Sequence, residues 1–228
     1  AGVPCMGSRA LRHDAPMRLD HVSYAVSNNE LSDTVQRLGS MIGAPFTDGG
    51  RHPTYGTRNF VLPLGDGCYI EVVTPLDHPA VDSKTFGRAV KRRAMEGGGW
   101  LTWVVAVDDI TVLEQRLGRP ASSGQRRRPD GFDLQWEQIG LTDLLDDPQL
   151  PFFVQWHSSP SEHPCVGGKP GTGLHALEIC GDQERIETWL GAPLATALEQ
   201  VNIIWVDADE PGLVAVHVQT PNGVVRLD

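Results

Sequence analysis

The stretch LDHVSYAV, residues 19–26, has two counterparts further along the chain, WLTWVVAV at residues 100–107 and LHALEIC at residues 174–180. Each has the length and apolar content of a β-strand, and each is followed by an apolar stripe at helical spacing that ends at a glycine. Strand-like segments follow each helix, at residues 57–64 and 68–74, 132–139 and 152–157, and 201–206, 214–219 and 224–227. The chain therefore passes three times through one pattern.

This repetition predicts an α+β fold of βαβββ modules, with two modules paired around a cleft and a divergent third module attached. The expected boundaries are residues 1–16 as a disordered extension or a remnant of cloning, 17–82 as the first module, 83–99 as a connecting helix and glycine linker, 100–157 as the second module, 158–172 as a linker and 173–228 as the third, divergent module.

Composition narrows the class of protein. The chain has 228 residues, 40% of them hydrophobic, and its 19 basic and 29 acidic residues give a net charge of −10. This acidic balance argues against nucleic acid and against an anionic membrane surface as partners, and no apolar run approaches the roughly 20 residues of a spanning helix. The four cysteines are scattered without a CxxC pair, which favours a reducing, cytoplasmic setting.

Short motifs occur in order along the chain. They are LDHV at 19–22, GGRHP at 49–53, GTRN at 56–59, LPLGDG at 62–67, YIEV at 69–72, RRRPDG at 126–131, LQW at 134–136, LPFF at 150–153 and QW at 155–156. In this order they resemble the glyoxalase-like domain family of the vicinal oxygen chelate superfamily, over about residues 19 to 227. The resemblance implies paired modules whose sheets curl around a cavity that usually holds a divalent metal, with His21 and Glu71 at ligand positions.

Alternation along the strands supports the same two residues as the centre of a site. His21 lies on the strand face opposite Val22 and Tyr24, which we expect beneath the following helix, and Glu71 lies opposite Ile70. His21 and Glu71 are therefore predicted to point into one cleft, as catalytic groups or as ligands of Zn, Ni, Fe or Mn. A histidine on a strand can also be a hydrogen-bonded structural residue.

The second module offers weaker donors. Thr102 occupies the position equivalent to His21 of the first module, and Gln155 the position equivalent to Glu71. A site that binds a divalent metal and a site without a metal are therefore both open alternatives. The run 126–128, three arginines, is either a solvated hairpin end or an attractor of an anionic substrate. The predicted substrate-binding residues are Arg51, His52, Asn59, Thr102, Phe153, Gln155 and His157.

Two functions fit these residues. The first is an enzyme, a glyoxalase-like lyase or isomerase or a dioxygenase-related protein, acting on a small oxygenated molecule such as an α-keto or hydroxy compound. The second is a non-catalytic binding or sequestering protein that keeps the cleft and has lost the metal site. Both take a small-molecule ligand, without nucleic acid or membrane, and a homodimer is an open alternative.

Overall fold

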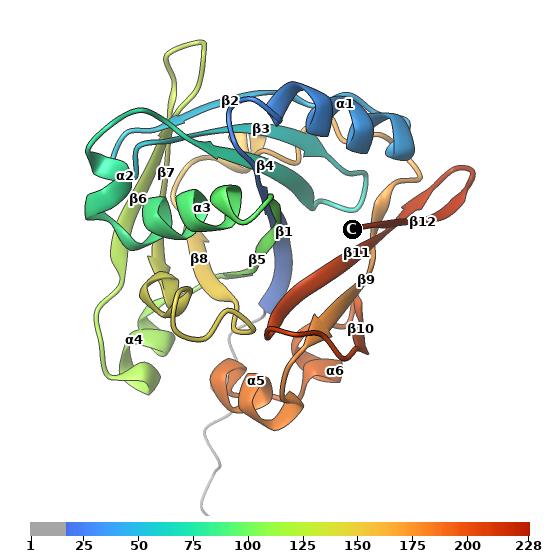
Figure 1. Cartoon of the computed structure of the whole chain (residues 1–228). Coiled ribbons are helices and arrows are strands. Elements are labelled where there is room, and N and C mark those ends of the chain that lie inside the picture. Colours follow the sequence, from blue (N-terminus) through green and yellow to red (C-terminus); the bar gives the residue numbers. More distant parts are fainter. Residues whose placement is uncertain (1–16) are drawn as a thin grey trace, which may run out of the picture.

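The computed structural model describes residues 17–228 and shows an α+β fold (Figure 1). The expectation for residues 1–16 lies outside the described residues. The first module contains β1 (Met17–Ala25), α1 (Leu31–Ile42), β2 (Thr47–His52), β3 (Thr57–Pro63) and β4 (Tyr69–Pro75). The second contains β5 (Gly99–Val107), α4 (Thr111–Leu117), β6 (Ser122–Arg127), β7 (Asp133–Ile139) and β8 (Phe152–Trp156).

Shorter elements and the third module complete the fold. Helices α2 (Ala80–Ser83) and α3 (Thr85–Met95) join the first two modules, and 3-10 turns occupy Leu141–Asp143 and Pro160–Glu162. The third module contains β9 (Gly173–Cys180), α5 (Gln183–Leu190), α6 (Leu194–Ala197), β10 (Asn202–Trp205), β11 (Gly212–Thr220) and β12 (Gly223–Leu227).

The first eight strands form one closed barrel, in the order β1-β4-β3-β2-β6-β7-β8-β5. Strand β1 runs parallel to β4 and antiparallel to β5, so the two modules join along β1 and β5 through eight residue pairs. On the opposite side they join through β2 and β6 by the single pair of Arg51 with Arg127. Gly50 lets the backbones approach there, since a Cβ on it would lie 1.9 Å from the carbonyl oxygen of Arg127.

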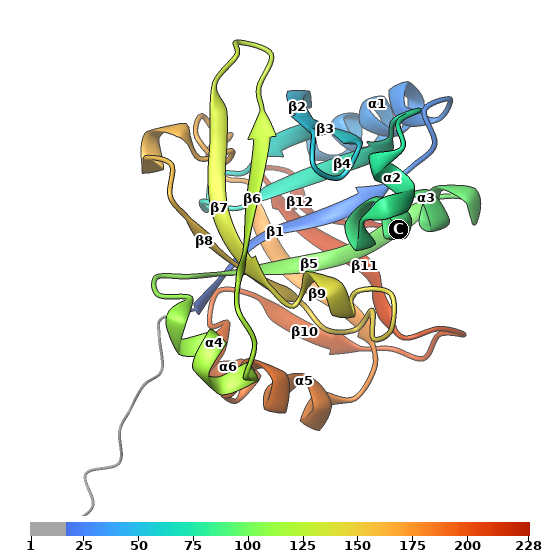
Figure 2. The ribbon, with the colours of Figure 1, turned by 90° about the vertical axis from the view of Figure 1, so that its left-hand side faces the viewer.

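The outer face of the barrel is covered by α1 and by the third module. Val22 belongs to the same buried cluster as Leu38 and Ile42 of α1, as the sequence pattern predicts. The indole of Trp100 on β5 donates to the carbonyl of Leu227 on β12, at 3.0 Å, which ties the third sheet to the barrel. Figure 2 shows this sheet beside β1 and β5, and the β6–β7 hairpin projecting beyond the other strands.

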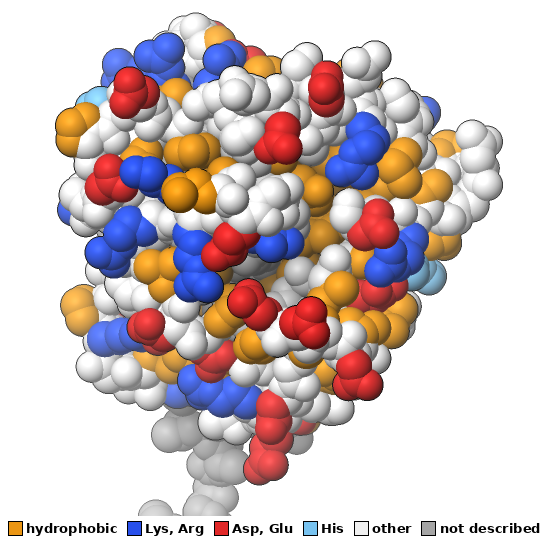
Figure 3. Space-filling model, in the orientation of Figure 1, with side chains coloured by type: hydrophobic (Ala, Val, Ile, Leu, Met, Phe, Trp, Pro, Cys, Tyr) orange, Lys and Arg blue, Asp and Glu red, His pale blue; other side chains and the backbone are white. Residues whose placement is uncertain are grey.

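The third module is divergent, as predicted, and its divergence lies in how its strands are connected. Its strand order is β10-β9-β11-β12, with β9 parallel to β10, whereas β1 of the first module is parallel to the last strand of that module. The sequence pattern repeats the order of elements without repeating their pairing. On the face shown in Figure 3, acidic and basic side chains are interspersed.

Candidate functional site

The barrel encloses a small cavity of about 40 Å³, which opens to the outside through a mouth. Helix α3 closes one end of the barrel, in front of the strands in Figure 1, and contributes Phe86 to the wall. A cavity of this size has room for a molecule of only a few non-hydrogen atoms unless side chains of the wall move. Its aromatic walls are formed by Tyr55, Tyr69, Phe86, Trp136, Phe152 and Trp156.

His21 and Glu71 both line this cavity, as their alternation predicts. The parallel pairing of β1 with β4 sets His21 beside Tyr69 and Ser23 beside Glu71, and all four side chains are on the inner face. The rings of His21 and Tyr69 stack with their centroids 4.3 Å apart. The strand pattern therefore brings the two predicted residues to one site.

A β-bulge turns Asp20 inward as well. The pairing of β1 with β5 skips Asp20, so two consecutive residues face the interior. The Asp20 carboxylate is 1% exposed and accepts hydrogen bonds from His21 Nδ1 at 2.7 Å, His163 Nε2 at 3.0 Å and Trp156 Nε1 at 3.1 Å. Burial opposes ionisation, but these bonds outweigh it and hold the pKa of Asp20 far below its usual range. The ionised carboxylate fixes the His21 ring with a proton on Nδ1.

The imidazole of His163 is the cation of this group. Burial is the largest single influence and opposes its charge, but the hydrogen bond and charge of Asp20, together with Cys165, outweigh burial and raise the pKa of His163 to about 9. His163 comes from the segment between the second and third modules and also packs edge-on against Trp156, with ring centroids 4.9 Å apart. The segment predicted as a linker thus supplies a partner of the buried Asp20 carboxylate.

The carboxylate of Glu71 is fully engaged. Asn59 Nδ2 donates to its Oε1 at 2.7 Å and the Ser23 hydroxyl donates to its Oε2. Burial would raise the pKa of Glu71, but the neighbouring imidazoles of His52 and His21 and these hydrogen bonds lower it. His52 Nε2 lies 3.8 Å from Glu71 Oε1, and burial lowers the pKa of His52 to about 4 despite that neighbour.

Arg126 places a second cation in the cavity wall. Alternation along β6 turns Gly124 and Arg126 inward, and Arg126 is 3% exposed. Within residues 17–228 its Nε is buried without a hydrogen-bond partner. Beside it, the Trp136 indole donates to Gln138 Oε1 at 2.8 Å, and the Gln138 amide contacts the Tyr55 hydroxyl.

Other predicted residues lie elsewhere. Phe153 faces outward from β8 in the same buried cluster as Trp189, and Gln155 accepts from the backbone N–H of Ile110 at 2.9 Å. The inner face of β8 is formed instead by Phe152, Val154 and Trp156. The sequence does not show which face is the inner one, because β8 is apolar on both faces. Exposed His157 contacts Glu137 at 3.0 Å, and Arg51 lies on the outer surface.

The remaining predicted residues are buried at or near the cavity. Asn59 donates to Glu71 from the neighbouring strand β3. Thr102 is opposite Ser23 on the inner face of β5, where its hydroxyl donates to the Trp103 carbonyl. His52 lines the cavity from β2, a strand that is not among those the sequence pattern predicts. Its Nδ1 is 3.0 Å from the Thr57 hydroxyl.

Sequence reasoning missed Asp20 and His163 altogether. Asp20 alternates with His21, so only an unforeseen bulge brings both inward, and His163 sits in a segment rich in Pro, Gly and Ser. Trp136 and Trp156 read as strand residues and do line the cavity. The isolated basic run at 126–128 was the signal that could have identified Arg126.

The donor set does not fit a divalent metal. Among residues 17–228, no three His, Cys, Asp or Glu side chains converge in a way that would hold a metal ion. Both oxygens of Glu71 already receive hydrogen bonds, from Ser23 and from Asn59. The expectation of His21 and Glu71 as metal ligands is therefore not supported by the chemistry of this site.

Comparison with known proteins supplies a family. The glyoxalase-like domain matches residues 19–194. The crystal structure of a hypothetical protein from Staphylococcus aureus matches with a TM-score of 0.59 at 15% identity, covering 93% of this chain and 86% of that chain. At that identity the likeness concerns the fold alone.

Other comparisons add less. A methylmalonyl-CoA epimerase from Mycobacterium tuberculosis matches with a TM-score of 0.42 at 19% identity, over 63% of this chain and 89% of that chain, too partially to bear on function. No curated protein matches the chain. No helix within residues 17–228 is long and apolar enough to cross a membrane.

Proposed function

This chain belongs to the glyoxalase-like domain family, and on that premise we propose that its barrel cavity binds a small α-keto or α-hydroxy compound and moves a proton on it. The observation that carries the proposal is the Asp20–His21 pair. Asp20 accepts from Nδ1–H of His21, so the lone pair of the ring is on Nε2. Within residues 17–228, Nε2 makes no hydrogen bond.

The reaction is of the isomerase or lyase type. His21 Nε2 accepts a proton from the carbon next to a carbonyl group, the electron pair of that C–H bond forms a carbon–carbon double bond, and the π pair of the carbonyl moves onto its oxygen. The same nitrogen then returns the proton to that carbon or, in the enediolate of an α-hydroxy carbonyl compound, to the former carbonyl carbon, while the hydroxyl proton of the neighbouring carbon passes to the other oxygen. Asp20 acts as a positioning residue, because it holds the ring and stabilises the imidazolium that forms.

The alternative function is binding without turnover. It is favoured by Glu71, whose two oxygens are both hydrogen-bonded and therefore poorly placed to take a further proton from a ligand. In that case the cavity sequesters the same class of molecule. The two functions differ in one measurable property, the exchange of carbon-bound hydrogen with solvent.

The test uses pyruvate, lactate, hydroxyacetone and phenylpyruvate as probes. Calorimetry measures binding, and proton NMR in D₂O measures the loss of the C–H signal next to the carbonyl. We expect His21→Asn to bind within a few-fold of the wild type and to lose about 100-fold or more of the exchange rate. His157→Gln is the matched control, because His157 is exposed and outside the cavity, and it should change neither quantity.

The outcomes separate the alternatives. Binding without exchange in the wild type would leave the sequestering function, and binding of none of the four probes would refute the proposal. A cytoplasmic location and a homodimer belong to the same proposal. Fractionation and light scattering test them. Cys68, Cys165 and Cys180 form no disulfide with one another in the described part of the chain, which fits a reducing compartment.

A further inference from the structure

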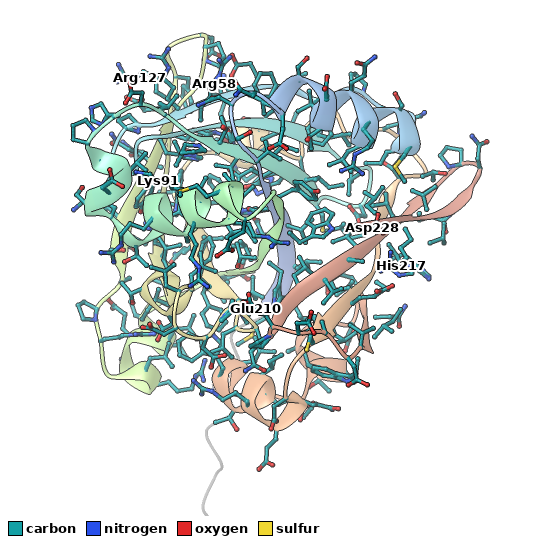
Figure 4. The ribbon with its side chains drawn as sticks, viewed as in Figure 1. Arg58, Lys91, Arg127, Glu210, His217 and Asp228 are labelled. Carbon is teal, nitrogen blue, oxygen red and sulfur yellow. The ribbon has the colours of Figure 1, made fainter. Side chains whose placement is uncertain are left out.

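Arg126 differs from its neighbours in the basic run. Arg127 donates to Asp133 at 2.7 Å, and Arg128 donates to Glu162 at 2.6 Å, so both outward-facing arginines have carboxylate partners on the protein. Figure 4 shows Arg127 at the outer end of the β6–β7 hairpin. Arg126 faces the cavity instead, and within residues 17–228 its guanidinium has neither an ion pair nor a hydrogen bond.

The carboxylates nearest to Arg126 are already committed. Glu71 is held by Ser23 and Asn59, and Asp20 is held by three ring N–H groups. Both influence Arg126 only from a distance, and burial keeps the pKa of Arg126 below its ordinary value. A buried guanidinium without a counterion is unfavourable, and the cost is relieved when an anion binds to it.

We propose that Arg126 binds the carboxylate of the ligand, so that the cavity selects a small monocarboxylic acid with an apolar or aromatic body. This inference rests on the proposed function and names the class of molecule that it takes. The planar guanidinium presents two parallel N–H donors, a geometry that matches a carboxylate. The aromatic walls, with Phe152 and Trp136 among them, take the body of the molecule.

The charges inside the cavity favour one negative charge over two. Asp20 and Glu71 are both ionised, while Arg126 and the protonated His163 are the cations facing them. His52 is neutral at pH 7, because its pKa is about 4. A phosphate dianion would meet two buried carboxylates with too little positive charge to offset them, whereas a monocarboxylate adds a single charge beside Arg126.

The experiment compares acids with their amides, which have nearly the same shape and no charge. Calorimetry measures pyruvate against pyruvamide, and phenylpyruvate against its amide, on the wild type and on Arg126→Met. We expect the acids to bind the wild type at least tenfold more tightly than the amides. Arg126→Met should weaken the acids by about 10- to 100-fold and leave the amides unchanged. Arg127→Met is the matched control and should alter no affinity.

Thermal unfolding adds a second readout. Without ligand, Arg126→Met should melt no lower than the wild type, because it removes an unpaired buried charge, and pyruvate should no longer raise its melting temperature. Should Arg126→Met fail to fold, Arg126→Lys and the acid–amide pairs on the wild type decide the matter. Lysine keeps the positive charge but lacks the two parallel N–H donors of the guanidinium, so part of the preference for the acids over the amides should remain.

Each result has one meaning. Amides that bind as tightly as the acids would overturn the role of Arg126 and leave the proposed function standing. Inorganic phosphate binding more tightly than every acid would overturn the carboxylate class. Binding of no probe, charged or neutral, would refute the proposed function itself.

Discussion

Replacing Asp20 by Asn tests the charge network of the cavity directly. The change keeps the size of the side chain and removes the charge to which His163 owes its pKa of about 9. A tenfold change in proton affinity is worth about 1.4 kcal/mol, so the rise from 6.5 sets an upper bound of about 3 kcal/mol. His163 keeps some contact with solvent, and we therefore expect Asp20→Asn to lower the free energy of unfolding by about 2 kcal/mol at pH 6.

The sign of the pH dependence follows from the raised pKa. The contribution of the Asp20–His163 pair is fully present below about pH 6.5 and is lost as the pH rises through about 9. Urea unfolding of both proteins at pH 6 and pH 10 should therefore show a large stability difference at pH 6 and a much smaller one at pH 10. Other groups that titrate in this range cancel in the difference.

Two controls accompany this experiment. Asp108→Asn removes an exposed carboxylate 3.6 Å from Arg18 and should give nearly the same small difference at both values of pH. NMR titration should locate the His163 pKa near 9 in the wild type and at a clearly lower value in Asp20→Asn, where burial lowers it and only Cys165 still raises it. An equal loss of stability at pH 6 and pH 10, or a wild-type His163 that titrates near 6.5, would refute the reasoning.

Three further variants probe the walls of the cavity. The His52 pKa of about 4 means that, between pH 4 and 6.5, the imidazole is protonated in the unfolded chain and neutral in the folded one. The free energy of unfolding should therefore rise by up to about 3 kcal/mol over this range, and His52→Gln should reduce that rise in urea unfolding. The same pH dependence in both proteins would contradict this prediction. In Gly124→Ala the new Cβ would lie 2.2 Å from Trp136 Nε1, so we expect the free energy of unfolding to fall by about 1–3 kcal/mol and the near-UV circular dichroism spectrum to change. An unaltered spectrum and stability would show that Trp136 moves aside without cost. Asn59→Leu removes a donor from the buried Glu71 carboxylate and should cost about 1–3 kcal/mol in urea unfolding, and a neutral result would mean that Glu71 is protonated in the folded protein.

The sequence predicted the fold where the apolar pattern is one-sided. Strand β1 has a clear inner and outer face, and so His21 is placed correctly, with Val22 in the outer core. Strands β2 and β6 were not foreseen, because TDGGRH and SSGQRR have the glycines and charges of loops. Their strand conformation comes from pairing with neighbours in the barrel, which local sequence does not encode.

The site was predicted less completely than the fold, for two physical reasons. Phe152 and Phe153 are adjacent and both apolar, so nothing local says which one faces the cavity, and the barrel decides it through the register of β8 with β5. The inward orientation of Asp20 depends on a β-bulge, because one extra residue in a strand reverses the face on which the preceding residues lie. His163 lies in a segment without a regular strand or helix pattern, so only the three-dimensional path of the chain brings it to the site.

The barrel's two seams differ in strength, with eight residue pairs between β1 and β5 against the one pair between β2 and β6. Local opening of a protein follows its least cohesive contacts, so we expect β2 and β6 to separate before β1 and β5 do. Backbone amides at that seam should lose their protons to deuterium well before those of β1. The barrel is thus closed in its average structure, and we expect it to fluctuate by opening between β2 and β6, with the β1–β5 pairing as the hinge.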